Sequence, residues 1–324
     1  MTAPVTARPV LVLHAGLQKT GTSDLQARLL KPKGPLGRAG FDTLAAAAAP
    51  LRAHHNAAWE AGGHRRHRPD LPGLAALAEG ARAASLSFAS SEDFSILDDR
   101  GIARLRGALE GIEVRPILVL RNPLDLAESL HAQACKRAPG DGFAEHLARM
   151  EHKGRLALDA VAARWARAFG GDALRCLAYE SHPDVTGAVL GLLGLPAGKL
   201  PARRRNVSLN ERFVEASQRL MRQAQAGDLP GFEGPEGLAR LVQALPAAGA
   251  RDARFLGRPV FLSRAEAAAF LDRMRPMAEA LARRLPLAPA WWAPDPARRE
   301  PEAPVPEDEA ALLDALRAPV AGPA

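Results

Sequence analysis

The 324-residue chain is 47% hydrophobic and carries a formal net charge of +7. This length and apolar content are enough to bury a full core, which excludes an extended or disordered protein. The positive charge suits anionic ligands such as phosphates, sulfates, acidic glycans or nucleic acid, although coding bias toward Ala and Arg explains it equally well. Composition alone therefore identifies no ligand or binding partner.

The two cysteines, Cys135 and Cys176, fall in different predicted elements and form no CxxC or Cys/His spacing. Neither a disulfide framework nor a zinc site is predicted from them. The apolar run over residues 10–13 is too short for a signal peptide, and no apolar stretch approaches the length of about 18 residues that a membrane helix needs. We expect a cytoplasmic protein without a membrane span.

Short apolar runs predict buried parallel strands, each followed by a turn and a helical pattern. The expected strands span residues 10–14, 86–89, 116–120 and 174–179. Helical periodicity covers residues 22–30, 101–110, 123–136, 156–169, 185–193, 209–225 and 265–285. The alternation predicts an α/β fold, a parallel sheet of about five strands flanked by helices, with a helical C-terminal part.

We expect a single domain over residues 1–292, followed by a Pro-rich and acidic tail over 293–324 that contains one short helix. Residues 36–80 have a weaker pattern and are interpreted as an insertion on the substrate side. This region holds a group of histidines at positions His54, His55, His64 and His67. Their spacing matches no metal-ligand motif, so a metal site is not predicted.

The first strand runs into Ala-Gly-Leu-Gln-Lys-Thr-Gly-Thr-Ser at residues 15–23, where a helix begins. A loop between a strand and a helix directs backbone N–H groups and a helix N-terminus at an anion, which predicts a phosphate site. In the loop of nucleoside triphosphatases a lysine follows the second glycine. Here Thr22 follows Gly21, and the only lysine of the loop is Lys19, so a nucleoside triphosphatase is disfavoured.

A second motif, Arg-Asn-Pro at residues 121–123, ends the strand over 116–120. Arg121 therefore falls at the carboxyl end of a parallel strand, where open α/β sheets bind ligands. Ser129 follows about two turns into the next helix. A guanidinium can bind a phosphate through two hydrogen bonds, although taken alone the motif could equally be a strand-capping arginine and a surface serine.

Together the two motifs resemble the 5'-phosphosulfate loop and the 3'-phosphate site of sulfotransferases that use 3'-phosphoadenosine 5'-phosphosulfate (PAPS), in particular the bacterial and glycan-directed ones. That family has a fold related to the nucleotide kinases. The resemblance implies that Lys19 contacts the 5'-phosphate and the bridging oxygen, that a further loop near residue 205 closes over the nucleotide, and that no metal takes part. The donor-binding residues that it implies are Gln18, Lys19, Thr20, Gly21, Thr22, Ser23, Arg121, Ser129, Arg204, Arg205 and Asn206.

Transfer to a hydroxyl also needs a base, because the attacking oxygen loses its proton. The strand over 86–89 ends in Ser-Ser-Glu-Asp, and the resemblance points to Glu92, since several glycan-directed enzymes carry an acid there. His14, at the end of the first strand, is the second candidate for the base. His54 and His55 rank third.

The function expected from these motifs is transfer of a sulfuryl group from PAPS to a hydroxyl or amine, with PAP as the leaving group. A carbohydrate acceptor is favoured by the acidic base. The alternatives are a non-catalytic protein that binds a nucleotide or an acidic glycan and, less favoured, a P-loop kinase, for which neither the lysine nor the magnesium ligands are present in the sequence. Nucleic acid is not an expected partner, because no motif that reads it is present.

Overall fold

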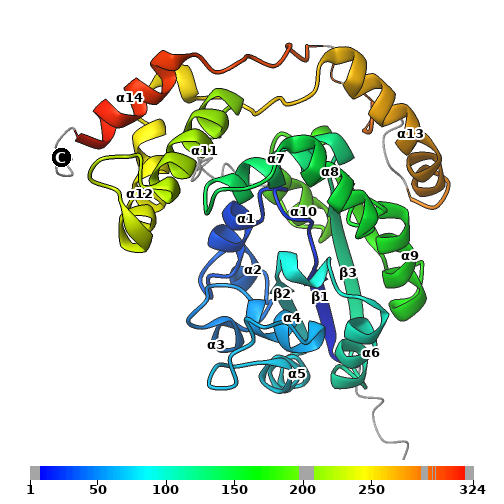
Figure 1. Ribbon diagram of the computed structural model, residues 1–324. Helices are drawn as coiled ribbons and strands as arrows, with labels where there is room; N and C mark the ends of the chain where they lie inside the picture. The colour runs from blue at the N-terminus through cyan, green and yellow to red at the C-terminus, as the bar shows by residue number, and fades with distance from the viewer. Residues whose placement is uncertain (1–7, 197–207, 286–290, 294, 296, 318–324) are drawn as a thin grey trace, which may run out of the picture. The chain divides into compact units, whose positions relative to one another are not determined.

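Figure 1 shows a computed structural model of the chain, which describes residues 8–196, 208–285, 291–293, 295 and 297–317. The chain divides into two compact units. The first comprises residues 1–122, 157–205 and 274–293, and the second comprises residues 123–156, 206–273 and 294–324. Each unit is therefore assembled from three separate stretches of sequence.

The first unit contains a parallel sheet with the strand order β2-β1-β3-β4, formed by β1 (Val10–His14), β2 (Leu86–Ser90), β3 (Glu113–Leu120) and β4 (Arg175–Ala178). All three pairings are parallel, and β1 lies between β2 and β3. The strands are apolar because the sheet is buried. The predicted α/β class is confirmed, with four strands in the described residues where about five were expected.

Helices flank this sheet, as the alternating pattern predicts. The helices of the first unit are α1 (Thr22–Leu29), α2 (Pro35–Arg38), α3 (Ala45–Ala48), α4 (His55–Gly62), α5 (Leu74–Ala83), α6 (Asp99–Ala108), α9 (Leu158–Phe169) and α10 (Val185–Leu192). Leucines of α1 and α10 share one apolar cluster with Val12, Phe88 and Val119 of the strands. Burial of these side chains holds the two helices against one face of the sheet.

Residues 36–80, which have a weak pattern in the sequence, form helices that are attached to the end of β2. His54 makes this attachment: its Nδ1 accepts a hydrogen bond from Ser90 N–H (3.1 Å), and its own N–H donates to the Ser90 carbonyl (2.9 Å). The His54 ring is fully buried, and burial lowers its pKa to about 4. A neutral, enclosed ring of this kind favours a structural role over a catalytic one.

The second unit consists of helices around a separate apolar core. Its helices are α7 (Pro123–Cys135), α8 (Phe143–His152), α11 (Glu211–Ala226), α12 (Gly234–Gly249) and α14 (Pro306–Arg317), while α13 (Arg264–Ala282) begins in this unit and ends in the first. The core includes Phe213, Leu220, Leu241, Phe255 and Leu312. Leu312 of α14 is fully buried there.

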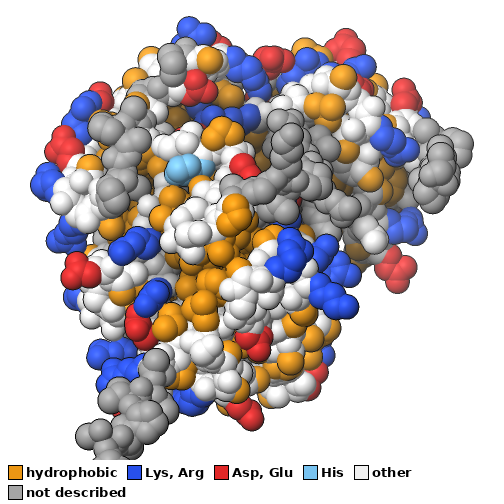
Figure 2. Space-filling model, turned by 180° about the vertical axis from the view of Figure 1, so that it is seen from behind, with side chains coloured by type: hydrophobic (Ala, Val, Ile, Leu, Met, Phe, Trp, Pro, Cys, Tyr) orange, Lys and Arg blue, Asp and Glu red, His pale blue; other side chains and the backbone are white. Residues whose placement is uncertain are grey.

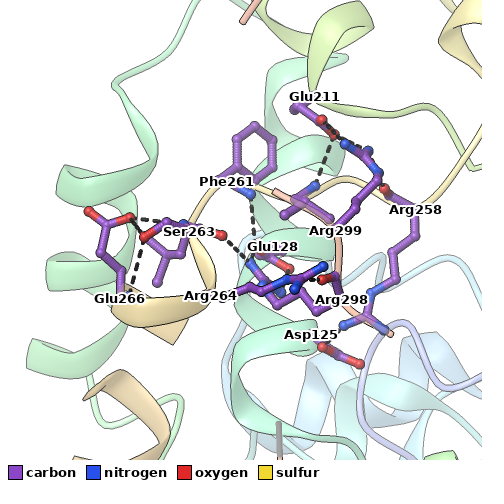
Figure 3. Close-up of polar contacts among 12 residues, drawn as sticks. Asp125, Glu128, Glu211, Arg258, Phe261, Ser263, Arg264, Glu266, Arg298 and Arg299 are labelled. Carbon is purple, nitrogen blue, oxygen red and sulfur yellow. Dashed lines mark hydrogen bonds and ion pairs between the residues drawn. The ribbon is translucent and has the colours of Figure 1, made fainter. Parts of the chain in front are cut away.

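A buried ion pair between Arg298 and Glu128 anchors Arg298 within the second unit (Figure 3). Arg298 Nη1 lies 3.1 Å from Glu128 Oε2, and Nη2 lies 2.7 Å from Oε1. The exposed fractions of the two side chains are 5% and 1%. The carboxylate also accepts a hydrogen bond from Phe261 N–H (2.8 Å), so the charges taken out of water are compensated by directed contacts.

None of the described helices has the length and apolar character needed to span a membrane.

Candidate phosphate-binding and transfer site

The loop between β1 and α1 first continues along β3 and then turns sharply. Ala15 N–H donates to Ile117 O (2.9 Å), and Leu17 N–H donates to Val119 O (3.0 Å). This pairing carries the loop past the carboxyl edge of the sheet before the helix begins. The predicted sequence of strand, loop and helix is therefore present, at the edge where parallel sheets bind ligands.

The turn itself depends on two residues in the left-handed region. Lys19 has φ 66° and Gly21 has φ 75°, and the Thr20 hydroxyl donates to the Leu17 carbonyl (2.6 Å). A lysine at positive φ is strained by roughly 1–3 kcal/mol, and such strain concentrates at functional sites. Gly21 is the N-cap of α1, whose first N–H groups have no partner within the helix and can bind an anion.

His14 and Gly16 pack tightly beneath this loop. A Cβ added at Gly16 would lie 2.6 Å from His14 Nε2, so the ring occupies the space that any larger residue would need. The His14 ring is fully buried, and its Nδ1 lies 2.9 Å from the Ser90 hydroxyl. The ring therefore cannot move aside without losing this contact. Glycine at position 16 follows from the close approach of the ring.

This packing gives a direct test of the loop. We expect Gly16→Ala to lower the free energy of unfolding by about 1–3 kcal/mol, because the added methyl overpacks a fixed ring. Gly107→Ala is the matched control, since a Cβ at Gly107 in α6 meets nothing within 4 Å and alanine favours a helix. Thermal unfolding of both variants measures the difference. Equal stability of the two would contradict the packing described here.

The environment of His14 does not favour it as a base. Burial lowers its pKa to about 4, and within the described residues its Nε2 has no hydrogen-bond partner. That nitrogen faces Gly16 of the loop. A base must reach the proton of a bound acceptor. The enclosed ring instead favours a role in shaping the loop.

Arg121 lies at the end of β3 and connects β3 to the loop. Its Nη1 donates to the Lys19 carbonyl (2.5 Å), and its guanidinium lies over the Tyr179 ring, 5.1 Å from the centroid. The side chain is buried, with 9% exposed. The arginine thus places a positive charge directly behind the turn at Lys19, and the tyrosine stacks on it. Tyr179 follows β4, and the sequence gives it no such role.

The residues beside Arg121 are held by the segment that follows β4. Asn122 N–H donates to Glu180 Oε1 (2.9 Å), and the Asn122 side chain donates to the Ala293 carbonyl (3.2 Å). Burial raises the pKa of Glu180, and the hydrogen bond from Asn122 opposes that shift. These contacts fix the backbone immediately after Arg121.

The end of β2 brings Glu92 next to α1. The Gln26 side chain, one turn after the start of α1, donates to Glu92 Oε2 (3.1 Å) and to the Ser90 hydroxyl (3.4 Å). Gln26 is buried, with 8% exposed. Because α1 begins at the phosphate loop, this contact places the Glu92 carboxylate on the same edge of the sheet as Lys19.

A second polar group surrounds Asp93, in the same turn as Glu92. His55 Nδ1 lies 3.3 Å from Asp93 Oδ2 and 2.9 Å from the Ser91 hydroxyl. Trp59 Nε1–H donates to Asp93 Oδ2 (2.8 Å). These residues come from α4, in the region that the sequence leaves without a pattern, so their meeting with the end of β2 was not predicted.

The first unit thus contains the loop with Lys19, together with His14, Arg121 and Glu92. Ser129 lies in α7, which belongs to the second unit. Three further predicted contacts lie outside the described residues: Arg204, Arg205 and Asn206. Within the described part of the chain, no group of three or more His, Cys, Asp or Glu side chains could hold a metal ion.

Basic side chains do not gather at one place on the face shown in Figure 2, where Lys and Arg are interspersed with Asp and Glu. Nucleic-acid binding surfaces concentrate positive charge on one face or along one element.

No protein-family model matches the chain, and no curated protein matches it. Among solved structures it is similar to a sulfotransferase from Alicyclobacillus acidocaldarius, with 19% sequence identity and a TM-score of 0.36. The similarity covers 74% of this chain and 97% of that one. An identity and a TM-score this low assign no activity, so the function rests on the residues of the site.

Proposed function

We propose that the protein is a sulfotransferase that moves a sulfuryl group from PAPS to a hydroxyl or amine of an acceptor. The proposal depends on one observation, the strained turn at Lys19 and Gly21 that leads into the N-terminus of α1. Arg121 donates a hydrogen bond to the Lys19 carbonyl in this turn. This turn offers backbone N–H groups, a helix N-terminus and the Lys19 ammonium group to a phosphate. Its lysine precedes the second glycine, unlike that of a nucleoside triphosphatase.

On the donor side, each residue has one task. Lys19 stabilises the negative charge that develops on the phosphate oxygen as the sulfur departs from it. The loop over residues 18–23 binds the 5'-phosphate, and Arg121 binds the 3'-phosphate, assisted by Arg204 and Arg205. Binding energy from the remote 3'-phosphate positions the reacting sulfur. No step of this scheme calls for a metal.

On the acceptor side, the proton of the attacking group passes to the polar cluster at the end of β2, which Glu92 and Asp93 form with His55. The Gln26 contact supports this assignment, because it holds the Glu92 carboxylate beside the helix that begins at the loop. We propose a carbohydrate as the acceptor, in keeping with the acidic residues at this strand end.

We propose a cytoplasmic location because neither cysteine is in a disulfide. Cys135 and Cys176 are free and buried, and burial raises the pKa of each thiol to about 12. Reduced, unreactive thiols are typical of the cytoplasm.

The donor site can be tested by calorimetric titration with PAP and with adenosine 5'-phosphate, which lacks the 3'-phosphate. We expect PAP to bind more tightly, and Arg121→Ala to weaken PAP binding by about 10- to 100-fold, as loss of a charge-assisted contact predicts. Arg115→Ala is the matched control, because Arg115 is an exposed arginine of the same strand. Its affinity for PAP should equal that of the wild type.

Equal affinity for the two nucleotides would contradict the proposal, since the 3'-phosphate would then have no site. Arg121→Lys separates charge from geometry, because lysine keeps the cation but cannot form the same planar contacts. Tight PAP binding without transfer from PAPS to any of a broad acceptor panel would favour the non-catalytic binding protein instead.

A further inference from the structure

His55 has the surroundings of an oriented histidine. It is the first residue of α4, and its Nδ1 faces the Ser91 hydroxyl at 2.9 Å and the Asp93 carboxylate at 3.3 Å. Both partners are themselves fixed, because Asp93 N–H donates to the Ser91 hydroxyl and Trp59 Nε1–H donates to the carboxylate. The ring orientation is therefore determined by residues from two different elements.

This orientation decides which nitrogen can accept a proton. With Nδ1 directed at a carboxylate, the proton of the neutral ring belongs on Nδ1, and Nε2 carries the lone pair. The hydrogen bonds of the His55 ring within the described residues are made through Nδ1, and the side chain is 18% exposed. A partly exposed imidazole that a carboxylate orients through one nitrogen has the arrangement of a general base.

The charges around His55 favour its protonated form. Burial alone would lower its pKa, but the hydrogen bond to Asp93 and the charges of Glu92 and Asp93 outweigh burial and raise it, against an opposing effect of Arg66. The neighbouring His54 is neutral, because burial holds its pKa at about 4. For Asp93, burial would raise the pKa, but the contacts with His55 and Trp59 lower it, so the carboxylate stays charged.

The partners of His55 connect it to the end of β1 and to an open hollow. Ser91, its partner, donates its N–H to the carbonyl of His14 (3.1 Å), the last residue of β1 before the loop. Asp93 and Trp59 line one side of a hollow of about 160 Å³, whose wall includes the exposed Ile96. A group bound in this hollow would contact the Trp59 ring and the Asp93 carboxylate, and these are the two side chains that lie against the His55 ring.

We propose that His55, oriented by Asp93, is the base that takes the acceptor's proton, and that the acceptor binds in the hollow beside Trp59. This inference rests on the proposed function and names the residue within the polar cluster that reacts. The acceptor oxygen forms a bond to sulfur, and its proton moves to Nε2 of His55. The bond between sulfur and the bridging phosphate oxygen breaks, and its electron pair leaves with PAP. Glu92 then acts through its charge, and Asp93 is a positioning residue.

The test uses the full chain with PAPS as the donor and water as the acceptor, measured as sulfate release in a single turnover. We expect His55→Gln to lower the rate by about 100-fold or more, as loss of a general base predicts, while PAP affinity changes by less than about twofold. His152→Gln is the control, because His152 is exposed and belongs to the second unit. The rate of that variant should equal the wild-type rate.

The pH profile separates the roles of the three residues. Transfer should require neutral His55, so the rate falls as pH drops through its pKa. Asp93→Asn and Glu92→Gln each remove a charge that raises this pKa, and we expect both to move the acidic limb to lower pH. Survival of more than a third of the rate in His55→Gln would overturn the inference. A larger loss in Glu92→Gln than in His55→Gln would overturn it as well.

A titration of the His55 ring by NMR tests the role of His55 separately from the proposed sulfuryl transfer. Its pKa should exceed the ordinary value of about 6.5 and should fall in Asp93→Asn. If the wild type fails to bind PAP, the proposed function is wrong. A ring that titrates at or below the ordinary value and is insensitive to Asp93→Asn overturns the inference about His55 alone.

Discussion

Replacing Lys19 by alanine is expected to lower the rate of sulfuryl transfer by about 100- to 1,000-fold, which is the range seen when one group that stabilises a developing charge is removed. The lysine lies in the strained turn before α1, where the departing phosphate oxygen of PAPS would gain its charge. Because the benefit arises mainly in the transition state, PAP affinity should fall much less than the rate. Single-turnover release of PAP from PAPS measures this effect.

Two controls make this result specific. Lys33→Ala removes an exposed lysine of the same unit and should leave both rate and affinity unchanged. The Lys19→Ala variant must also keep the wild-type melting temperature, because a collapsed loop would lower the rate for another reason. A Lys19→Ala variant that loses PAP affinity and rate by the same factor would assign the lysine to binding and not to catalysis.

Replacing Arg298 by methionine is expected to lower the free energy of unfolding by about 3–5 kcal/mol, because Glu128 would remain buried and charged without its partner. The carboxylate is 1% exposed and accepts two hydrogen bonds from the arginine (Figure 3). Chemical denaturation followed by circular dichroism measures the loss. Circular dichroism suits this measurement because the described core of the second unit is formed by helices.

An exposed ion pair of the same unit supplies the control. Arg317 and Asp314 are 76% and 78% exposed and 3.8 Å apart, so Arg317→Met should change the stability by less than about 0.5 kcal/mol. The double variant Arg298→Met with Glu128→Leu should recover part of the loss, since it leaves no buried charge. If Arg298→Met and Arg317→Met lose the same stability, the buried pair does not stabilise the unit as described.

The strands and the loop could be predicted from the sequence because their signals are local. Four short apolar runs predict the strands, and Gly21, two positions after Lys19, predicts the turn. The positive φ of Lys19 could not be predicted in this way, since lysine gives no conformational signal of its own. It depends on the pairing of the loop with β3 and on the contact with Arg121.

The polar cluster at the end of β2 could be predicted only in part. Glu92 follows directly from its place after a strand, whereas His55 lies 37 positions earlier, in a region without clear periodicity. Only tertiary packing of α4 brings that ring to Asp93. Arg298 and Glu128 are separated by 170 positions in the sequence. From the sequence alone, each would be predicted to be an ordinary charged residue on the surface.

The three-part assembly of the second unit has a consequence for synthesis on the ribosome. Glu128 is made early, but Arg298 and the α14 residues that enclose its core are made long afterwards. Until then the nascent chain carries an uncompensated carboxylate and an open apolar surface on α11 and α12. Whereas N-terminal domains commonly fold while translation continues, this unit can complete its core only after residue 312 has emerged.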